Sequence, residues 1–557
     1  MLNEYYQSEL AYYRDLAQEF ARAFPEVAHL VAQRGGDAAV ERLIQGAALL
    51  TGRMRHRIDD DFPELIHALF DMLWPQHLCP VPAVTLLRLE PLGEALRQSQ
   101  LLPRGVEVRS RAVDGVECTF RTTSQAGVHP LRVEEARLAH PHPADLELQI
   151  LLRLTGGATF DNVKLQRLQV QLVGDRVTNF TLLMWLARFA RGVSICDRNG
   201  ERCATLPRGS IRPVGMLDEE SLAPFSPTPL PGLRLMQELF CFPEKFMAVE
   251  VTGLDQTPVG RLRDAFWLVF HLGSTSQAGV VVDPGRFALG CTPAVNLSAS
   301  IPIELMVEER CSVYRLRAPS GGEIYSVDRV GAFDAVTDRW VEYEPFLAPP
   351  PVGQQGLRPR YHIIRRADGP GGIQTYLSIV DHNGRPLQPP AAALSLSVTC
   401  TDGDRPLRLD VGEVGATGPQ FVSAANIIPV MPGVPLVLGR ERHWQLAAQF
   451  AMHPRDLMSL NGLRQLLETC RPPGDRPPQL VRDLRTRVSS RLHRQMVIPL
   501  TQVEVELDPA AFLCEGEMFL FGRVLSALLR DRPHSRTFTE VTLVAGPDGA
   551  RYTFGAP

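Results

Sequence analysis

The stretch LNEYYQSELAYYRDLAQEFARAF, residues 2–24, decides how the beginning of this chain folds. Its apolar residues recur at steps of four, three, four, three and four: Tyr6, Leu10, Tyr13, Ala17, Phe20 and Phe24. Residues 40–58 repeat the same steps with Val40, Ile44, Ala47, Thr51, Met54 and Ile58. A stripe of this narrow spacing is typical of a helix that lies along another helix. The sequence therefore predicts two amphipathic helices that pack in a bundle.

A third helix is predicted directly after the acidic run Asp59-Asp60-Asp61. Asp61 and Glu64 have the spacing of a capping box, and Pro63 stands in the first turn, where its missing N–H costs nothing. The residues that follow give one apolar face before Trp74-Pro75 ends the helix: Leu65, Ile66, Leu69, Phe70 and Leu73. Residues 1–80 are therefore expected to be helical, with an ordinary self-contained helical core as the simpler alternative.

From about residue 81 the hydrophobic pattern changes to period two, which indicates strands. Strands are expected at 84–89, 146–154, 168–172, 246–252, 266–272, 323–330, 394–398, 503–507 and 538–544, and helices at 179–190, 233–240, 443–450, 456–469 and 519–530. Proline-rich breaks separate these groups. We expect a multidomain α+β protein with a helical segment over 1–80, β-rich domains over 81–225 and 226–435, and a mixed α/β domain over 436–557.

Composition excludes several classes of protein. Of 557 residues, 45% are hydrophobic and 22% charged, as in a globular protein with real cores. The net charge of -4 gives no electrostatic support for binding nucleic acid or an anionic membrane. Ten cysteines are scattered without a C-x-x-C pair, which argues against a disulfide framework or a cysteine-based zinc site.

The sequence favours a cytoplasmic location. The first residues include Glu4 and several aromatic residues in place of a basic start and an apolar core, so no signal peptide is expected. The uncharged run from Phe421 to Gly439 is long enough to span a membrane, but Asn426 and three prolines would break a helix there. We interpret this run as an extended linker and expect no direct membrane insertion.

No catalytic signature is present. The Gly-Lys-Ser/Thr phosphate loop, the H-E-x-x-H helix, the G-x-S-x-G elbow and a G-x-G-x-x-G turn after a strand are all missing from the sequence. The acidic run 59–61 is explained by helix capping better than by metal binding. His140 with His142, and Cys196 with Cys203, lack further ligands nearby in sequence. We therefore expect no enzymatic activity, no catalytic residues, no cofactor and no metal.

Several segments, in order along nearly the whole chain, resemble one protein family. They are YYQSELAYYRDLAQEFA at 5–21, ERLIQG at 41–46, DDDFPEL at 59–65, LMQELFCFPEKF at 235–246, YSVDRV at 325–330, the tryptophan segment 444–460, and FLFGRVL at 519–525 with 535–540 after it. Each piece is weak alone, but together and in this order they are specific. The chain resembles the TssF family (also called VasA or ImpG), baseplate subunits of the bacterial type VI secretion system.

The resemblance implies a structural subunit of a baseplate wedge, in the cytoplasm at the inner-membrane-docked baseplate. It implies a complex of two copies of this chain with one TssG-like subunit, joined by TssK-like, TssE-like and VgrG-like proteins, and no nucleic acid. The helical stripes would then bind partner helices. The residues that we expect at this interface are Tyr6, Leu10, Tyr13, Phe20, Phe24, Ile44 and Met54 in the bundle and Phe62, Leu65, Ile66 and Leu69 at a junction.

Two other functions stay open at this point. The chain could be a cytoplasmic adaptor whose helical segment forms a groove for a cargo or effector protein. It could also be a hydrolase whose site gathers polar residues that are distant in sequence, such as Asp328, Arg329 and His382.

Overall fold

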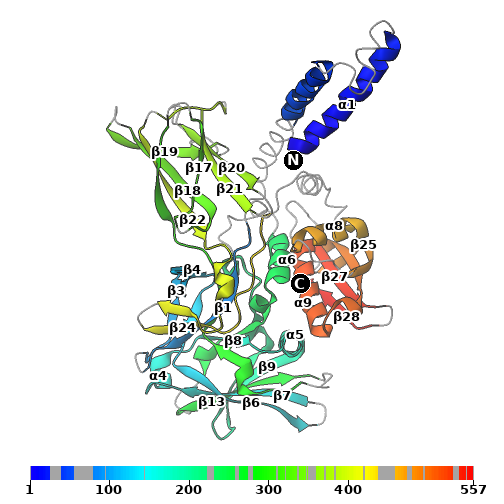
Figure 1. Ribbon diagram of the computed structural model, residues 1–557. Coiled ribbons are helices and arrows are strands. Elements are labelled where there is room, and N and C mark those ends of the chain that lie inside the picture. Colours follow the sequence, from blue (N-terminus) through cyan, green and yellow to red (C-terminus); the bar gives the residue numbers. More distant parts are fainter. Residues whose placement is uncertain are drawn as a thin grey trace. The chain divides into compact units, whose positions relative to one another are not determined.

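The computed structural model describes residues 2–24, 39–55, 80–93, 96–142, 145–222, 231–257, 262–273, 280–308, 311–319, 321–334, 338–346, 348, 359–368, 372–381, 384–389, 391–417, 421–436, 458–472, 479–493, 496–530, 538–546 and 549–555. The chain divides into two compact units. Unit 1 contains Met1–Leu73 with Gly439–Ala447, and unit 2 contains Trp74–Leu438 with Ala448–Pro557. Figure 1 shows that the described part of unit 1 is helical, whereas most of unit 2 is built from strands.

Unit 1 contains α1 (Leu2–Ala23) and a second helix over residues 39–55. Both lie where the apolar periodicity predicts helices. The two helices touch closely at one point, because a Cβ added to Gly52 would lie 3.2 Å from the backbone N of Tyr6. A larger residue at position 52 would push the helices apart there.

Unit 2 contains two larger and several smaller sheets. A six-stranded sheet has the order β23 (Val414–Thr417), β3 (Glu107–Val113), β4 (Val116–Thr122), β15 (Cys291–Val295), β1 (Val84–Pro91) and β24 (Val422–Asn426). A seven-stranded sheet has the order β16 (Ile301–Met306), β22 (Ala393–Thr401), β18 (Glu323–Asp334), β19 (Arg339–Pro345), β20 (Arg360–Asp368), β21 (Gly372–Val380) and β17 (Val313–Arg315). A pair joins β2 (Gln100–Leu102) and β5 (Ala126–Val128).

Two further sheets share one core with the helices of unit 2. One has the order β10 (Arg202–Pro207), β9 (Ala190–Asp197), β13 (Ala265–Leu272), β7 (Asp145–Leu154) and β6 (Leu131–His142). The other has the order β11 (Ile211–Pro213), β12 (Ala248–Thr252), β8 (Arg167–Leu172) and β14 (Phe287–Leu289). Their apolar faces join one continuous cluster with α5 (Arg176–Met184), α6 (Pro231–Cys241), α8 (Leu460–Cys470) and α9 (Glu515–Arg530).

The C-terminal sheet has the order β25 (Val481–His493), β26 (Met496–Leu507), β27 (Phe538–Ala545) and β28 (Arg551–Phe554). β26 and β27 are parallel, and α9 connects them. The buried side chains of this sheet, such as Val503, Val505 and Leu543, belong to the same cluster as β7, β8 and β13. The core of the predicted C-terminal domain therefore continues into the predicted middle domains.

Most of the strands and helices predicted from the sequence are confirmed. The helix expected at 179–190 begins three residues earlier, because the Asp175 carboxylate accepts a hydrogen bond from the Thr178 N–H at 2.9 Å and caps it. It ends in a π-helical turn, η3 (Trp185–Phe189), with Trp185 buried. The helix expected at 443–450 lies outside the described residues.

The interpretation of residues 421–439 as a linker is wrong for their described part. β24 pairs with β1, and Met431 and Val434 form bridges to Val84 and Val81. Asn426 is 1% exposed, and its side-chain oxygen accepts hydrogen bonds from the N–H groups of Gly412 and Val414. Part of the run is buried in a sheet, which favours uncharged residues, and its buried polar side chain, Asn426, is fully bonded.

The helices α5, α6 and α9 approach one another backbone to backbone. A Cβ added to Gly232 of α6 would lie 2.2 Å from the Cα of Leu528, and one added to Gly516 of α9 would lie 2.3 Å from the carbonyl oxygen of Phe180. Real side chains do not come so close to backbone atoms. Glycine at these two positions therefore allows the helices to pack at this distance.

We predict that Gly232→Ala loosens the packing of α6 on α9. The added methyl group meets backbone, which cannot rotate away, so unfolding should become easier by about 1–3 kcal/mol. Hydrogen exchange of the α9 amides in urea measures this. Gly46→Ala is the control, because a Cβ at Gly46 meets nothing within 4 Å and alanine favours a helix. Equal α9 exchange in both variants would contradict the prediction.

A buried ion pair lies in the segment 235–246. Lys245 donates to the Glu238 carboxylate, and these side chains belong to residues that are only 3% and 5% exposed. Glu238 also accepts hydrogen bonds from the Ser221 hydroxyl at 3.2 Å and the Leu222 N–H at 2.8 Å. Burial lowers the pKa of Lys245, and the neighbouring Glu238 opposes this. The pair ties the end of α6 to the loop at 218–222.

We predict that Lys245→Met destabilises unit 2 by about 3–5 kcal/mol, because it leaves the Glu238 carboxylate buried without its cation. The double variant Glu238→Gln with Lys245→Met should regain part of this loss. Thermal unfolding followed by circular dichroism compares them. Lys164→Met is the matched control, because Lys164 is exposed and is the chain's other lysine. A Lys245→Met protein as stable as this control would contradict the prediction.

Candidate docking interface

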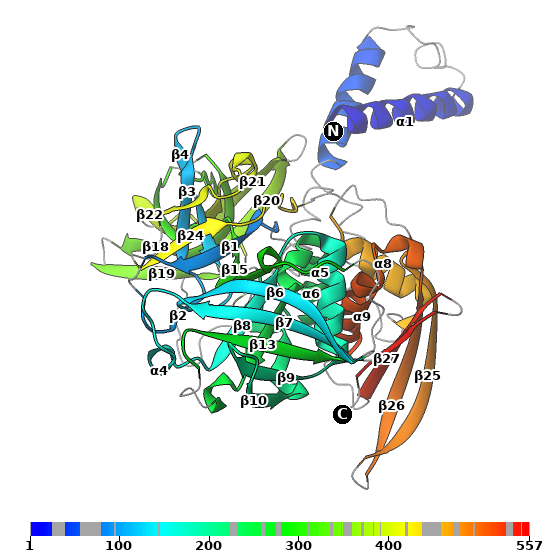
Figure 2. The same cartoon turned by 90° about the horizontal axis from the view of Figure 1, so that it is seen from below.

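The two helices of unit 1 are held together by one buried seam and two ion pairs. Leu10 is 5% exposed and Ala48 is fully buried. Arg14 pairs with Glu41, and Arg55 pairs with Glu9 at 2.7 Å. In Figure 2 the helices meet near the beginning of α1 and separate toward its end. The charged groups that bridge the helices thus pair within the unit, although the buried Arg14 Nε has no hydrogen-bond partner among the described residues.

The predicted interface residues fall into two groups in the structure. Those near the start of α1 turn inward: Leu10 is buried, and Tyr6, Tyr13 and Ile44 are partly buried. Those further along stay open, with Phe20 47%, Phe24 54% and Met54 64% exposed. The rings of Phe20 and Phe24 lie 4.7 Å apart between centroids. Part of the stripe is therefore used within unit 1, and part is left uncovered.

Unit 1 also exposes apolar side chains that the stripe pattern missed. They are Tyr12 at 61%, Leu16 at 44%, Leu43 at 73%, Leu49 at 50% and Leu50 at 66%. Tyr12, Leu16, Phe20 and Phe24 follow one another at steps of four, so they form a second stripe along α1. The sequence shows this spacing, but α1 also carries the buried seam, and the spacing alone does not tell which stripe packs within unit 1. Phe62, Leu65, Ile66 and Leu69, predicted at the junction, lie outside the described residues.

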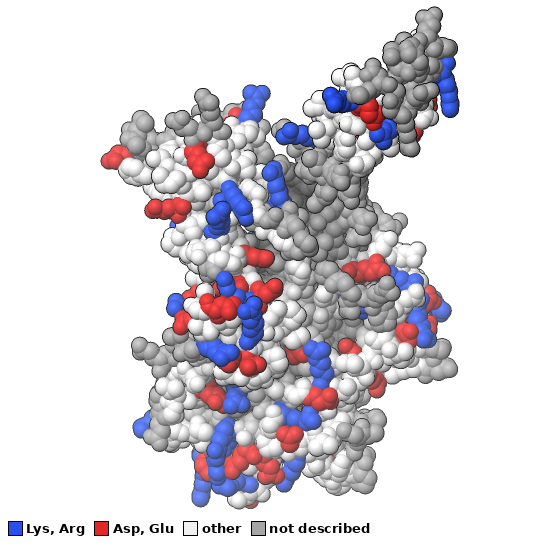
Figure 3. Space-filling view, in the orientation of Figure 1, with Lys and Arg blue, Asp and Glu red and all other residues white. Residues whose placement is uncertain are grey.

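The face of the molecule in Figure 3 carries acidic and basic side chains that alternate over short distances. No extended patch of one sign is visible on its described residues in this view.

Two of the three residues named for a possible hydrolytic site, Asp328 and Arg329, bond to neighbouring side chains. Asp328 accepts hydrogen bonds from the hydroxyls of Ser300, Ser326 and Thr399, at 2.7–2.8 Å. Arg329 pairs with Glu342 at 2.8 Å, and His382 lies outside the described residues. Within the described part of the chain, no group of three or more His, Cys, Asp or Glu side chains is placed to hold a metal ion.

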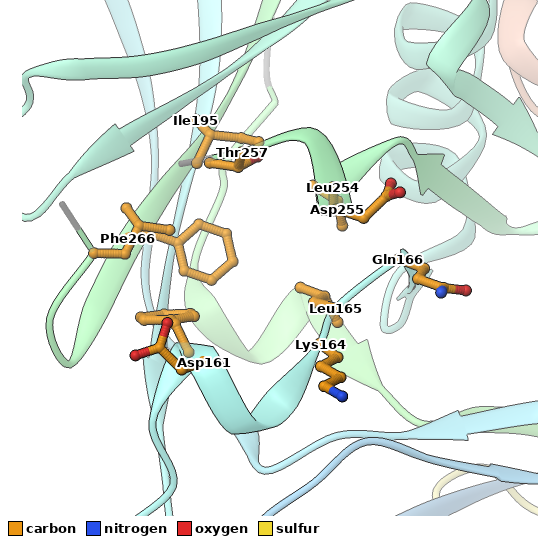
Figure 4. Close-up of a pocket in the computed structure, with 11 residues that line it drawn as sticks. Asp161, Lys164, Leu165, Gln166, Ile195, Leu254, Asp255, Thr257 and Phe266 are labelled. Atoms are coloured by element: carbon orange, nitrogen blue, oxygen red, sulfur yellow. The ribbon is translucent and has the colours of Figure 1, made fainter. Parts of the chain in front are cut away.

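A cavity of about 350 Å³ opens between β9, β13 and the turn before β8. Figure 4 shows Phe266, Ile195 and Leu165 around this space, with Lys164 and Asp255 directed away from its centre. The Thr257 hydroxyl is buried there and has no hydrogen-bond partner among the described residues. The described part of the lining holds Asp161, Lys164, Asp255 and Thr257 as its reactive polar residues and contains no histidine, cysteine or serine.

Among the residues that the structure describes, no helix is both long enough and apolar enough to cross a membrane.

Comparisons with known proteins identify the family. The sequence profile described as "Type VI secretion system, TssF" matches residues 1–554. Type VI secretion system component TssF1 of Pseudomonas aeruginosa is 28% identical over 608 residues, which cover 98% of this chain and 97% of that protein.

Two solved structures contain chains of similar fold. One is a TssK-TssF-TssG baseplate subcomplex of the type VI secretion system, revealed by cryo-electron microscopy. The similar chain has a TM-score of 0.79 and 25% identity, with 93% of this chain and 98% of that chain covered. The other is the baseplate complex from the type VI secretion system, with a TM-score of 0.63 and 22% identity over 100% and 99% of the two chains. With a profile match over nearly its whole length, this chain belongs to the TssF family of the type VI secretion system.

Proposed function

We propose that this chain is a structural, non-enzymatic subunit of the type VI secretion baseplate wedge. The observation that carries the proposal is its likeness, along nearly its full length, to a chain solved within a TssK-TssF-TssG baseplate subcomplex. The shared fold covers 93% of this chain and 98% of that chain.

The partners follow from the same likeness. We propose that the chain binds a TssG-like and a TssK-like subunit, and that two copies of it join one TssG-like subunit. Contacts with TssE-like and VgrG-like proteins, and a place in the cytoplasm against the inner membrane, rest on the family resemblance.

Unit 1 supplies a physical reason to expect partner helices. Its described helices expose Tyr12, Leu16, Phe20, Leu43 and Leu50, each at 44% or more. Burying one such side chain contributes about 1.5–3 kcal/mol. A helix of another subunit, laid along these stripes, would remove them from water and hold the complex together. The interface residues named from the sequence stay a prediction, to which Tyr12, Leu16, Leu43, Leu49 and Leu50 are now added.

We predict that Leu16→Asp with Phe20→Asp prevents assembly with the TssG-like partner. Two exposed apolar contacts are replaced by charges, so binding should weaken by at least about a hundredfold. Co-purification of the co-expressed pair shows whether the variant has lost binding to the partner. Native mass measurement of the wild-type complex gives its stoichiometry.

Gln7→Asp with Gln18→Asp is the matched control, because it adds the same charge at exposed polar positions of α1. The control should still assemble. Assembly of the Leu16/Phe20 variant at wild-type strength would refute the interface, and a wild-type chain that never joins the TssG-like protein would refute the wedge role.

A further inference from the structure

The C-terminal sheet ends in a long edge strand. β25 has 13 residues and pairs only with β26 among the described strands. Figure 2 shows β25 on the outer side of β26, with both strands extended well beyond the helices. β27 begins at Phe538, opposite Leu500, so residues 490–493 and 496–499 form a ribbon of two strands. Such a ribbon is only marginally stable alone and gains from a third strand.

Among the described residues, contacts from the chain itself reach the beginning of this edge and Thr486, whose hydroxyl donates to the Met458 carbonyl at 3.4 Å. The Arg464 guanidinium of α8 donates to the Val481 carbonyl at 2.7 and 3.1 Å and to the Arg482 carbonyl at 3.3 Å. The Leu484 N–H donates to the Asp483 carboxylate at 2.8 Å. Beyond Leu484, within the described residues, no hydrogen bond from another element reaches the outward backbone of β25.

The direction of the remaining backbone groups follows from these bonds. The Leu484 N–H is turned away from β26, since it bonds to a side chain instead, and antiparallel pairs alternate between bonded and non-bonded residues. Leu484, Thr486, Val488 and Ser490 therefore point their N–H and C=O groups outward. Their neighbours Arg485, Arg487 and Ser489 bond to β26.

The opposite edge of the ribbon is closed. Pro499 of β26 lies opposite Ser490, so the position of its missing N–H is on the outer side of β26. Proline on an edge strand prevents another strand from pairing there. A third strand can therefore join this ribbon along β25 and not along β26.

The charge on β25 indicates which kind of strand could pair with its outer edge. Residues 481–493 contain four arginines and one aspartate. Arg485 pairs with Asp483 at 2.9 Å and stands opposite Glu504. Arg487 is exposed, stands opposite Gln502, and has no ion pair within the described part of the chain. A second copy of β25 would place arginine against arginine, which destabilises a strand pair, whereas carboxylates would complement it.

The geometry points to β25 as a docking edge for an extended, acidic segment of a partner protein, which adds to the C-terminal sheet as a further strand. Main-chain hydrogen bonds to Thr486, Val488 and Ser490 supply the affinity, and carboxylates near Arg487 supply the selectivity. The edge lies in unit 2 and is independent of the unit 1 helices and of the wedge role.

The test uses the full chain and two short synthetic peptides, one alternating threonine with glutamate and the other alternating threonine with lysine. Hydrogen exchange of residues 484–490 reports strand addition, and fluorescence anisotropy reports affinity. We expect the glutamate peptide to bind and to slow exchange at 484–490, and the lysine peptide to do neither. Arg487→Glu should weaken binding of the glutamate peptide and strengthen binding of the lysine peptide. Arg487→Gln should only reduce the difference in affinity between the two peptides.

Val488→Pro removes one outward N–H without removing a hydrogen bond to β26. It should weaken binding of the glutamate peptide by about tenfold. Val488→Thr keeps the N–H and a branched side chain, so it should bind as the wild type does. Unchanged exchange of the α9 amides confirms that each variant is folded. Peptide binding that survives Val488→Pro, no protection at 484–490 by the glutamate peptide, or sedimentation showing that β25 pairs with a second copy, would each overturn the inference.

Discussion

The close approach of α9 to α5 and α6 is the contact on which unit 2 depends. Gly232 and Gly516 let these helices meet at backbone distance, and the same cluster of buried side chains runs from β7 and β8 into the C-terminal sheet. Residues more than 300 positions apart, such as Leu148 and Val505, thus share one core. Close packing of this kind couples the sheets of unit 2 to its helices, so a change at one of these glycines should be felt across the shared core.

Unit 1, in contrast, leaves many of its apolar side chains exposed. Its helices bury Leu10 and Ala48, but they leave Tyr12, Leu43 and Leu50 at 61%, 73% and 66% exposure. Apolar patches on this scale mark sites of protein association in soluble proteins. The sequence and structure together therefore describe a self-sufficient body with a helical element that needs covering. A baseplate subunit requires both properties, since it must keep its own fold and be bound by its neighbours.

The sequence predicted local structure correctly where the pattern of apolar residues was clear. The pattern of apolar residues predicted α1, α9, β7 and β13. The first part of β7 alternates buried and partly buried residues, whereas β13 is an apolar run that is buried along nearly its whole length. The described part of 421–439 was misread, since a strand and an extended linker can both be uncharged and proline can follow either. The six-stranded sheet, which joins β1 and β4 to β15 and β24, could not be predicted, because pairing between distant segments leaves no mark in local composition.

The candidate interface was only partly predictable for a related reason. Two stripes run along α1, and the sequence cannot tell which of them the chain uses for itself. The structure separates them, because Gly52 lies against Tyr6 and so fixes which side of α1 faces the second helix. The edge position of β25 could not be predicted either, since it depends on the order of the strands and not on the strand's own residues.

We propose that helices of another subunit complete the helices of unit 1. Hydrogen exchange of the α1 amides, in the free chain and in the complex with its TssG-like partner, measures whether they do. We expect α1 to exchange much faster than α9 in the free chain, and to become as protected as α9 in the complex. An α1 already as protected as α9 in the free chain, and unchanged by the partner, would contradict it.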